Sequence, residues 1–235
     1  MEKRASVAMA VYNGEKYIEE QIDSILDMME ENDELIISYD KSQDRTLDII
    51  KAYEAKDKRV KVVYDDGRSV ESNFNNAVKN CIGKYIFLAD QDDVWINDKI
   101  NVMVDYFEMH PECVVLVANG YLTNSRLENC GEIFQEYSTS DNPFRNFIKG
   151  TYLGCQMAFC STIKNRVWPV NVNPPLAHDL WLGVKGAKYG KVELLDRMLI
   201  KHRLHEENFS NTSKMKLIDV IKNRILFLTK LLFEI

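Results

Sequence analysis

Three carboxylates lie almost side by side near the middle of the chain, at Asp90, Asp92 and Asp93. The apolar run at 85–89 that precedes them has the length and composition of a strand buried on both faces. Carboxylates packed this closely repel one another unless a cation lies among them, and hard oxygen ligands suit Mg²⁺ or Mn²⁺ holding a phosphate. The plainer interpretation is an acidic turn, with Asn97 as N-cap of the helix that follows.

A fourth carboxylate and three basic residues in the second half of the chain are further candidates. Asp179 follows His178 and precedes an apolar helical run, where an acid taken alone is an ordinary helix N-cap. His202, Arg203 and His205 lie within four residues of one another. One histidine in such a run is usually a surface residue, but two histidines with an arginine can contact a diphosphate or a metal ion.

The first half of the sequence alternates between strand patterns and helical patterns. Strands are expected at 5–11, 34–39, 60–64 and 85–89. This alternation is typical of an α/β fold with a mostly parallel central sheet and helices on both faces. Ligands bind such sheets outside the carboxyl ends of the strands, so we expect the loops at Asn13, Asp40 and Asp90 to meet there.

The second half of the sequence is less regular. Further strands are expected at 114–118, 191–195 and 198–204. The polar stretch 125–141 predicts a loop or a hairpin. Short helices are expected at 144–148, with Asp141 or Asn142 as cap, and after Ser161, which could cap a helix that ends at Val167.

Length, charge and cysteine usage narrow the function classes. The 235 residues suit one large α/β domain or two small ones, and 46% of them are hydrophobic, which is enough for a full core. A net charge of -6 argues against nucleic-acid binding. The sequence contains no uncharged apolar stretch of about 18 residues, so no transmembrane helix is expected. Five cysteines without metal-type spacing, and a start without a signal-peptide pattern, predict a reducing, cytoplasmic setting.

The usual glycine-rich phosphate motifs are missing from this sequence. It contains no GxxxxGK[ST] stretch, and no GxGxxG pattern follows the first expected strand. A diphosphate bound at this sheet edge would therefore need a metal ion rather than a glycine cradle. That requirement again indicates Asp90 and Asp92 as candidate residues.

Taken together, these residues resemble the family 2 inverting glycosyltransferases, which have the nucleotide-binding GT-A fold. The resemblance covers residues 6 to about 210. The stretch 10–14, AVYNG, looks like the family's first-strand motif, and 90–93, DQDD, looks like its acidic metal-binding motif. In the stretch 38–46, Asp40 falls on the second Asp of the family's second-strand motif, while Tyr39 and Lys41 depart from that motif.

The resemblance implies a role for each matching residue. The nucleotide would be bound by Val11, Tyr12, Asn13, Asp40, Asp90 and Gln91. A Mg²⁺ or Mn²⁺ ion would be held by Asp92 and His205, and Asp179 falls on the family's general base. The diphosphate and acceptor would be contacted by Asp93, Trp95, His178, Trp181, His202 and Arg203, with Asn208 and Ser210 in the closing segment.

The resemblance also implies a reaction. A sugar would move from a UDP- or dTDP-linked donor to a hydroxyl of a saccharide or lipid-linked saccharide, with inversion at the anomeric carbon. A cation would stabilise the departing diphosphate, and a carboxylate would take the proton of the acceptor hydroxyl. Residues 89–95 and 178–181 most resemble rhamnosyltransferase-like enzymes that build bacterial surface polysaccharides.

The last 22 residues, 214–235, have the period of an amphipathic helix. They carry five basic and two acidic residues, a net charge of +3, so the remaining chain carries -9. Such a helix can lie on an anionic membrane, here the inner face of the plasma membrane, or pack on its own domain or on a second copy in a homodimer. We therefore expect a transferase domain at 1–213, with a nucleotide-binding half at 1–110 and an acceptor-binding half at 111–213.

Two other functions fit parts of this pattern. A non-catalytic module binding a sugar nucleotide or polysaccharide could use the same fold, and the departures at Tyr39 and Lys41 leave that reading open. A sugar-1-phosphate nucleotidyltransferase would also use Mg²⁺ and a nucleotide. It should show a glycine-rich loop with Arg and Lys after the first strand, which residues 13–16, NGEK, match poorly.

Overall fold

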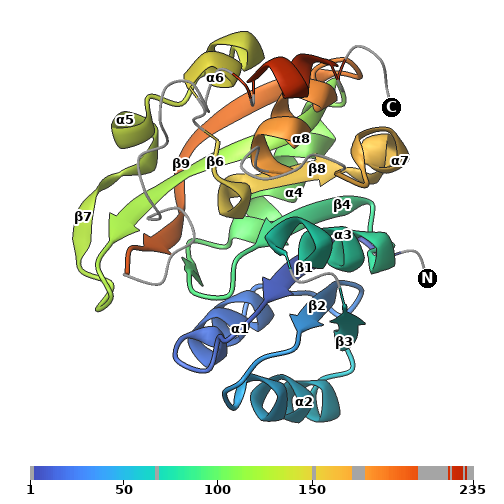
Figure 1. Ribbon diagram of the computed structural model, residues 1–235, viewed down its shortest axis with the longest axis vertical. Helices are drawn as coiled ribbons and strands as arrows, with labels where there is room; N and C mark the ends of the chain where they lie inside the picture. The colour runs from blue at the N-terminus through green and yellow to red at the C-terminus, as the bar shows by residue number, and fades with distance from the viewer. Residues whose placement is uncertain are drawn as a thin grey trace.

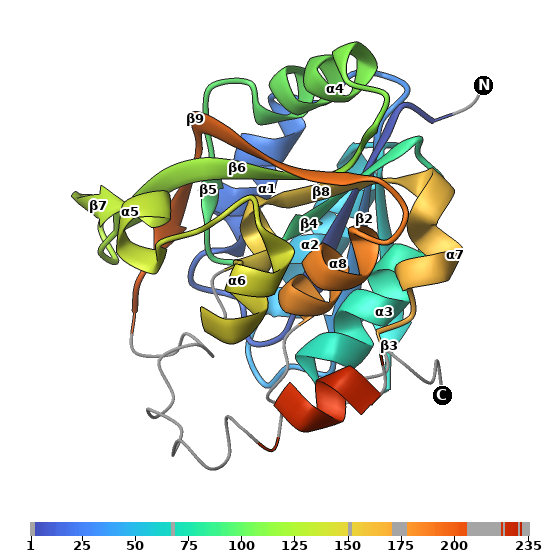
Figure 2. The same ribbon diagram turned by 90° about the horizontal axis from the view of Figure 1, so that it is seen from above.

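The computed structural model describes residues 3–66, 69–149, 152–170, 178–205, 222, 224–229 and 231. Within them, nine strands form one curled sheet with helices on both faces (Figures 1 and 2). The strand order is β3-β2-β1-β4-β8-β6-β9-β5, and β7 pairs with β6 outside this path. The sheet is therefore continuous across the two halves of the sequence.

The first half of the sheet is parallel, as the sequence predicts. Its strands are β1 (Ala5–Val11), β2 (Glu34–Asp40), β3 (Val60–Asp65) and β4 (Tyr85–Ala89). The helices that connect them are α1 (Ile18–Leu26), α2 (Thr46–Lys56) and α3 (Val70–Asn80). Every residue of β4 is buried, because helices cover both faces of this part of the sheet.

The second half of the sheet mixes strand directions. Its strands are β5 (Val94–Trp95), β6 (Cys113–Thr123), β7 (Asn129–Glu132), β8 (Met157–Cys160) and β9 (Lys191–Arg203). β8 runs antiparallel to both β4 and β6, while β6 and β9 are parallel. The prediction of two short strands after 190 was wrong, because Asp196 and Arg197 form a bulge within β9 rather than a turn.

The helices of the second half agree with the sequence in most places. They are α4 (Lys99–Met109), α5 (Ile133–Tyr137), α6 (Pro143–Lys149), α7 (Lys164–Val167) and α8 (His178–Gly186), with 3₁₀ turns at Gly154–Gln156 and Ser161–Ile163. Asn142 caps α6, since its Oδ1 accepts from the amides of Phe144 and Arg145. Asn97 does not cap α4: it lies one residue too early, and its side chain donates to the Met198 carbonyl at 2.7 Å.

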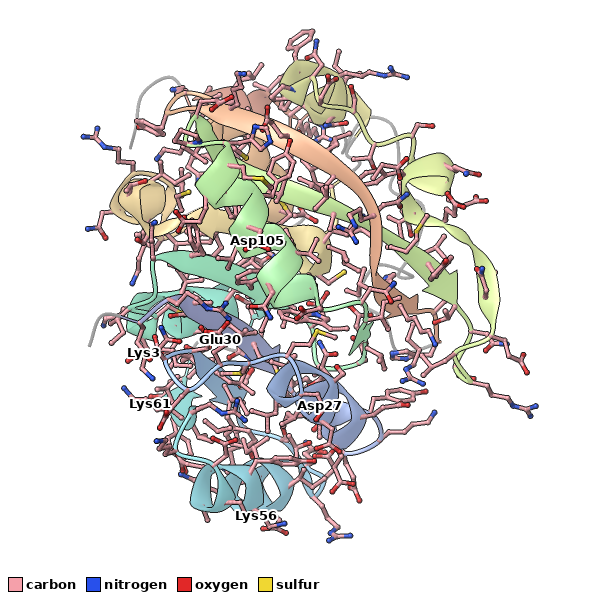
Figure 3. The ribbon with its side chains drawn as sticks, turned by 180° about the vertical axis from the view of Figure 1, so that it is seen from behind. Lys3, Asp27, Glu30, Lys56, Lys61 and Asp105 are labelled. Carbon is pink, nitrogen blue, oxygen red and sulfur yellow. The ribbon has the colours of Figure 1, made fainter. Side chains whose placement is uncertain are left out.

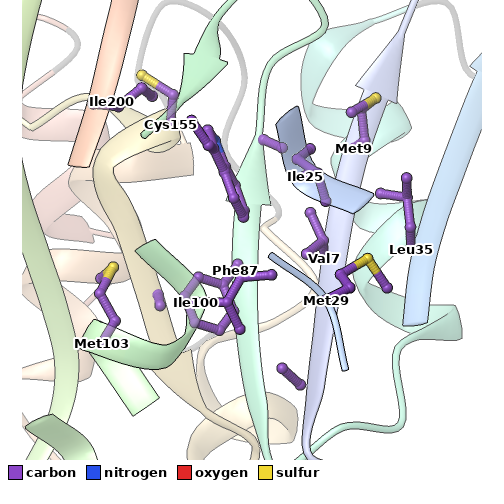
Figure 4. Packing of buried hydrophobic residues seen from close by; sticks show 14 of the residues in the cluster. Val7, Met9, Ile25, Met29, Leu35, Phe87, Ile100, Met103, Cys155 and Ile200 are labelled. Atoms are coloured by element: carbon purple, nitrogen blue, oxygen red, sulfur yellow. The ribbon is translucent and has the colours of Figure 1, made fainter. Parts of the chain in front are cut away.

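Two apolar layers hold the sheet between its helices. In one layer, residues such as Val7 and Met9 of β1 pack with Ile25 of α1 and with Ile100 and Met103 of α4 (Figure 4). The other layer packs the opposite face of the sheet against α3, α7 and α8. Charged side chains such as Asp27, Lys56 and Asp105 lie on the outer, exposed sides of the first layer's elements (Figure 3).

The described part of the C-terminal segment packs on the domain. Residues 224–229 are helical and lie next to α6 and α8 (Figures 1 and 2). Phe227 is fully buried, with its ring 5.2 Å from that of Phe147 and 5.4 Å from that of Trp181. Most of the predicted amphipathic helix at 214–235 lies outside the described residues. No helix among the described residues has both the length and the hydropathy needed to cross a membrane.

Candidate active site

The loops after β1, β2 and β4 meet at one edge of the sheet, where the sequence placed the nucleotide. Tyr12 and Gln91 bond in both directions: the Tyr12 amide donates to Gln91 Oε1 at 2.9 Å, and Gln91 Nε2 donates to the Tyr12 carbonyl at 2.8 Å. The Asn13 amide donates to Ser42 Oγ at 2.9 Å, and the Gln43 amide donates to Asn13 Oδ1 at 2.9 Å. The predicted convergence of these loops is therefore confirmed.

Two further predicted nucleotide contacts belong to the same edge. The Val11 carbonyl accepts a hydrogen bond from Asn73 on α3, which fixes the end of β1. Asp40 is partly exposed at the end of β2. Next to it, the Tyr39 hydroxyl accepts from the Ser42 amide at 3.0 Å, so a tyrosine holds this loop where the family motif has an acid. Lys41 is exposed.

Asp92 and His205 face each other across this edge. Asp92 Oδ2 lies 2.8 Å from His205 Nε2, although 113 residues separate them in sequence. Both side chains are mostly buried but not sealed, with 14% and 9% of their surface exposed. A carboxylate oxygen and an imidazole nitrogen this close can chelate one divalent cation, and the imidazole favours Mn²⁺ over the strictly oxygen-seeking Mg²⁺. The residues present therefore fit the metal that the sequence predicts.

Asp93 and His202 form a second pair between the β4–β5 loop and the end of β9. Asp93 Oδ1 lies 2.8 Å from His202 Nδ1 and also accepts from the Arg203 amide at 3.1 Å. Burial would lower the pKa of His202, but the Asp93 carboxylate raises it to about 9. Burial would raise the pKa of Asp93, but the His202 ring and the Arg203 amide hold it below its usual value. The pair is therefore ionised at neutral pH and joins the β4–β5 loop to the end of β9.

Two further ionisable groups lie at this loop: Asp90 within it and Lys99 at the start of α4. Burial raises the pKa of Asp90 to about 8, and the neighbouring carboxylates of Asp93 and Asp92 act in the same direction. Lys99 is fully buried below them, 4.1 Å from the centroid of the Trp95 ring, and donates to the Cys155 carbonyl at 2.5 Å. Burial lowers the pKa of Lys99 to about 8. A protonated Lys99 therefore offsets part of the acidic charge beside it.

Asp179 lies in the first turn of α8, in the second half of the sequence. Burial raises its pKa to about 7; the backbone amides of Leu180 and Asp179 and the charge of Arg224 act against this, and the charge of Glu71 adds to it. The Asp179 charge adds slightly to the raised pKa of Asp90, after burial and the carboxylates of Asp93 and Asp92. A carboxyl group that titrates near pH 7 is suited to accept a proton at neutral pH.

Several predicted contact residues are buried in packing interactions. His178 lies 4.2 Å from the Phe74 ring, centroid to centroid, and burial lowers its pKa to about 4, so the imidazole is neutral at pH 7. Trp181 donates from Nε1 to the Val167 carbonyl at 2.8 Å. Trp95 packs between Phe87 and Lys99. Their predicted contacts with diphosphate or acceptor stay predictions, as do those of Asn208 and Ser210, which lie outside the described residues.

Sequence reasoning missed residues that reach the site from distant elements. Tyr17 and Glu20 contact the end of β9, and Arg224 acts on Asp179 from the C-terminal segment. Tyr17 was visible only as one apolar position of a helical pattern. Arg224 was visible only as one basic residue of the tail. Neither pattern indicates which distant residue such a side chain contacts.

Comparison with known proteins assigns a family to this geometry. Residues 6–167 match the family model described as "Glycosyl transferase family 2". An uncharacterised glycosyltransferase of Haemophilus influenzae is 28% identical over 219 residues, covering 88% of this chain and 67% of that protein. A putative teichuronic acid biosynthesis glycosyltransferase of Bacillus subtilis, TuaG, is 30% identical over 153 residues, covering 64% of this chain and 59% of TuaG. The chain thus spans about two thirds of the length of these curated relatives.

Solved structures share the fold at low sequence identity. The structure of S. aureus TarS 1-349 in complex with UDP-GlcNAc superposes with a TM-score of 0.72 at 19% identity, covering 97% of this chain and 66% of that one. The mannosyltransferase PcManGT from Pyrobaculum calidifontis, in complex with GDP-Man and Mn²⁺, gives a TM-score of 0.64 at 14% identity, covering 98% of this chain and 70% of that one. Both likenesses extend over nearly all of this chain.

Proposed function

The chain belongs to glycosyl transferase family 2, and on that basis we propose that it is a metal-dependent, inverting hexosyltransferase. It moves a sugar from a nucleoside diphosphate, UDP- or dTDP-linked, to a hydroxyl of a saccharide or lipid-linked saccharide. The observation that carries this proposal is the pairing of Asp92 with His205 at 2.8 Å, beside the loops that would hold the nucleotide.

The loop between β4 and β5, residues 90–93, is called the acidic loop, and its residues would lie next to a bound diphosphate. Asp92 and His205 would hold the cation, which would supply charge stabilisation to a departing diphosphate. The ionised Asp93–His202 pair is neutral as a whole and holds this loop to the end of β9, while the protonated Lys99 adds one positive charge. Tyr12 bonds to Gln91 and Asn13 bonds to the loop after β2, and the exposed side chains of Tyr12 and Asn13 can contact the nucleotide.

Asp179 acts from the other half of the domain as the general base. The ionised carboxylate accepts the proton of the acceptor hydroxyl while that oxygen attacks the anomeric carbon from the face opposite the diphosphate. A single displacement of this kind inverts the anomeric centre and needs no covalent enzyme intermediate. The pKa of about 7 keeps a substantial fraction of Asp179 ionised at neutral pH and still able to take a proton.

The relatives support the substrate classes in this proposal. TarS was solved with UDP-GlcNAc and PcManGT with GDP-Man and Mn²⁺, so both of these proteins bind sugar nucleotides. TuaG and a second Bacillus subtilis relative, the putative glycosyltransferase EpsE, carry names linked to glycosyl transfer, TuaG in teichuronic acid biosynthesis. We propose surface polysaccharide synthesis as the setting on this basis. The rhamnosyltransferase-like subgroup stays a prediction from the sequence.

Calorimetry tests the proposal directly. UDP, dTDP and GDP would be titrated into the protein with Mn²⁺, with Mg²⁺ and with EDTA. We expect tight binding of one nucleotide only with metal, and a metal effect that disappears in Asp92→Ala, because that substitution removes one of two protein ligands. Turnover would be measured in parallel as nucleoside diphosphate released from a panel of donor sugars.

The outcomes separate the proposal from its alternative. Equal binding of every nucleotide by the unsubstituted protein with and without metal would overturn the metal-dependent site. Metal-dependent nucleotide binding with no transfer, across a broad panel of donors and acceptors, would indicate a sugar-nucleotide-binding module instead.

A further inference from the structure

The residue that precedes helix α1, Tyr17, contacts one of the two proposed metal ligands through its aromatic ring. Tyr17 immediately precedes α1 and is mostly buried. Its ring lies 4.9 Å from the ring of His205, and the guanidinium carbon of Arg203 lies 4.5 Å from the same ring, both measured to the Tyr17 centroid. Tyr17 therefore contacts both His205, a proposed metal ligand, and Arg203.

Arg203 connects the first turn of α1 to the loop that carries Asp92. Its Nε donates to the Asp92 carbonyl at 2.8 Å, and its Nη1 donates to the Ser125 carbonyl at 2.8 Å. Its Nη2 donates to Oε2 of Glu20, in the first turn of α1, at 2.5 Å. Only 3% of the Arg203 side chain is exposed. Each guanidinium nitrogen thus bonds to a protein oxygen, on three different segments.

We propose that Tyr17 and Glu20 are positioning residues for the metal site, and that Arg203 transmits their effect rather than contacting the diphosphate. This inference rests on the proposed metal-dependent function and names residues that set its metal affinity. The Tyr17 ring limits the rotation of the His205 imidazole. Glu20 orients the Arg203 guanidinium, which in turn fixes the backbone at Asp92. The two ligands are then held at the separation that a single cation requires.

General physical chemistry supports this assignment. A histidine ligand binds a metal well only when its ring is already oriented, and loss of an orienting neighbour typically weakens metal affinity about 10- to 100-fold. Arginine has a rigid, planar fork of donors, so three simultaneous bonds fix its position more firmly than a lysine ammonium could. An arginine spread over the Tyr17 ring adds a cation–π contact in a mostly buried place.

The experiment measures Mn²⁺ affinity of the full chain at saturating nucleotide, by calorimetry and by electron paramagnetic resonance. Tyr17→Leu should weaken Mn²⁺ binding about 10- to 100-fold, whereas Tyr17→Phe, which keeps the ring, should stay within about twofold. Glu20→Gln, an exposed and milder change, should weaken it severalfold. Tyr106→Leu is the matched control, because Tyr106 stacks on His110 at 4.3 Å away from the site.

The outcomes distinguish a failure of this inference from a failure of the metal-dependent function on which it rests. Unchanged Mn²⁺ affinity in both Tyr17→Leu and Glu20→Gln would overturn the inference while leaving the metal-dependent function intact. Absence of Mn²⁺ binding by the unsubstituted protein would overturn the function itself. Should Tyr17→Leu fail to fold, Glu20→Gln carries the test alone. An equal loss in Tyr106→Leu would also overturn the inference, because the effect would then be one of general stability.

Discussion

Asp179 occupies a position where acid–base chemistry and helix capping make different demands on one side chain. A general base acts on the acceptor in the transition state and barely touches the nucleotide. Asp179→Asn keeps the size and the hydrogen-bonding shape but cannot accept the proton. We expect turnover to fall by about 10² to 10⁴ while donor binding stays unchanged, as measured by nucleotide release and by calorimetry.

The melting temperature provides the control for this substitution. Asn serves as well as Asp near a helix N-terminus, so α8 should form in either case. A well-folded Asp179→Asn protein with near-normal turnover would show that the base lies elsewhere. His178 is then a weak second candidate, because burial lowers its pKa to about 4 and its ring packs on Phe74.

The raised pKa of Asp179 predicts the pH dependence of turnover. With a pKa of about 7, the ionised fraction grows about tenfold between pH 6 and pH 8, and kcat/KM should rise accordingly. The folded pKa lies above the unfolded one, so any stability from this group is present at low pH and is lost as the pH rises through 7. The titration of Asp179 therefore does not add stability over the range in which it should raise activity.

Arg224→Gln tests the origin of that pKa. The Arg224 charge lowers the pKa of Asp179, so its removal should move the rising limb of the pH profile to higher pH. Lys222→Gln, an exposed change in the same helical segment, is the matched control and should leave the limb in place. Identical profiles for the two variants would place Arg224 outside the site.

The candidate residues that the sequence predicts best are those that end a strand. Asp90, Asp92 and Asn13 follow apolar runs with clear boundaries, and the edge of a parallel sheet brings such loops together. Tyr17 and Glu20 could not be predicted, because their partner Arg203 lies more than 180 residues away. A hydrophobic pattern shows which face of α1 is buried. It does not show which side chain that face meets.

At the scale of elements, the pairing of β6 with β9 positions His205, one of the two proposed metal ligands, which follows β9. The register between them shifts on either side of Asn119, next to Gly120. A Cβ atom at Gly120 would lie 2.3 Å from Ile200 Cγ2 and 2.6 Å from the Ile200 carbonyl oxygen. The strands can approach this closely only because Gly120 has no side chain.

Gly120→Ala should therefore separate the two strands near the site. A backbone oxygen cannot move aside as a side chain can, so we expect a loss of about 1–3 kcal/mol in the free energy of unfolding. Mn²⁺ binding should weaken as well, since His205 follows β9 directly. Urea titration and calorimetry measure the two effects. Unchanged unfolding with weakened metal binding would mean that the strain is absorbed locally.

The elements themselves were predictable where local patterns decide them. The four parallel strands and their helices follow from alternation of period, and Asn142 follows from its capping chemistry. β9 was predicted as two strands, at 191–195 and 198–204, with Asp196 and Arg197 left between them. Only the partner strand β6 shows that they form a bulge.

At the scale of the whole molecule, one sheet joins a parallel half to a mixed half. The acidic loop leaves β4 in the parallel half, and the helix that carries Asp179 packs on the mixed half. The predicted division at 110 separates these roles in sequence, but β8 pairs with β4 and makes the sheet continuous. The pairing of β8 with β4 joins strands that lie far apart in the sequence. The hydrophobic period of a strand does not show which distant strand it pairs with.

The C-terminal segment has a buried side and an exposed apolar side. Phe227 is fully buried, whereas Ile225 is 58% and Leu228 is 40% exposed. On the adjacent helix α6, Phe144 is 68% and Ile148 is 59% exposed (Figures 1 and 2). The packing of Phe227 shows that part of the segment belongs to the domain. Membrane binding by this segment therefore stays a prediction. The exposed apolar residues that would contact the membrane are Ile225 and Leu228 of the segment and Phe144 and Ile148 of α6.

Flotation with anionic liposomes tests this surface on the folded protein. We expect the unsubstituted chain to float, less so at high salt, because basic residues near such a surface contribute about 1 kcal/mol each. The double substitution Ile225→Gln and Leu228→Gln should reduce the bound fraction about tenfold or more, since each removed anchor was worth about 1–2 kcal/mol. The matched control replaces Ile82 and Met109, which are 68% and 70% exposed, with Gln. Equal flotation of all three proteins would contradict the prediction. A concentration-dependent dimer that the first pair alone abolishes, seen by analytical ultracentrifugation, would assign the surface to a second copy of the chain.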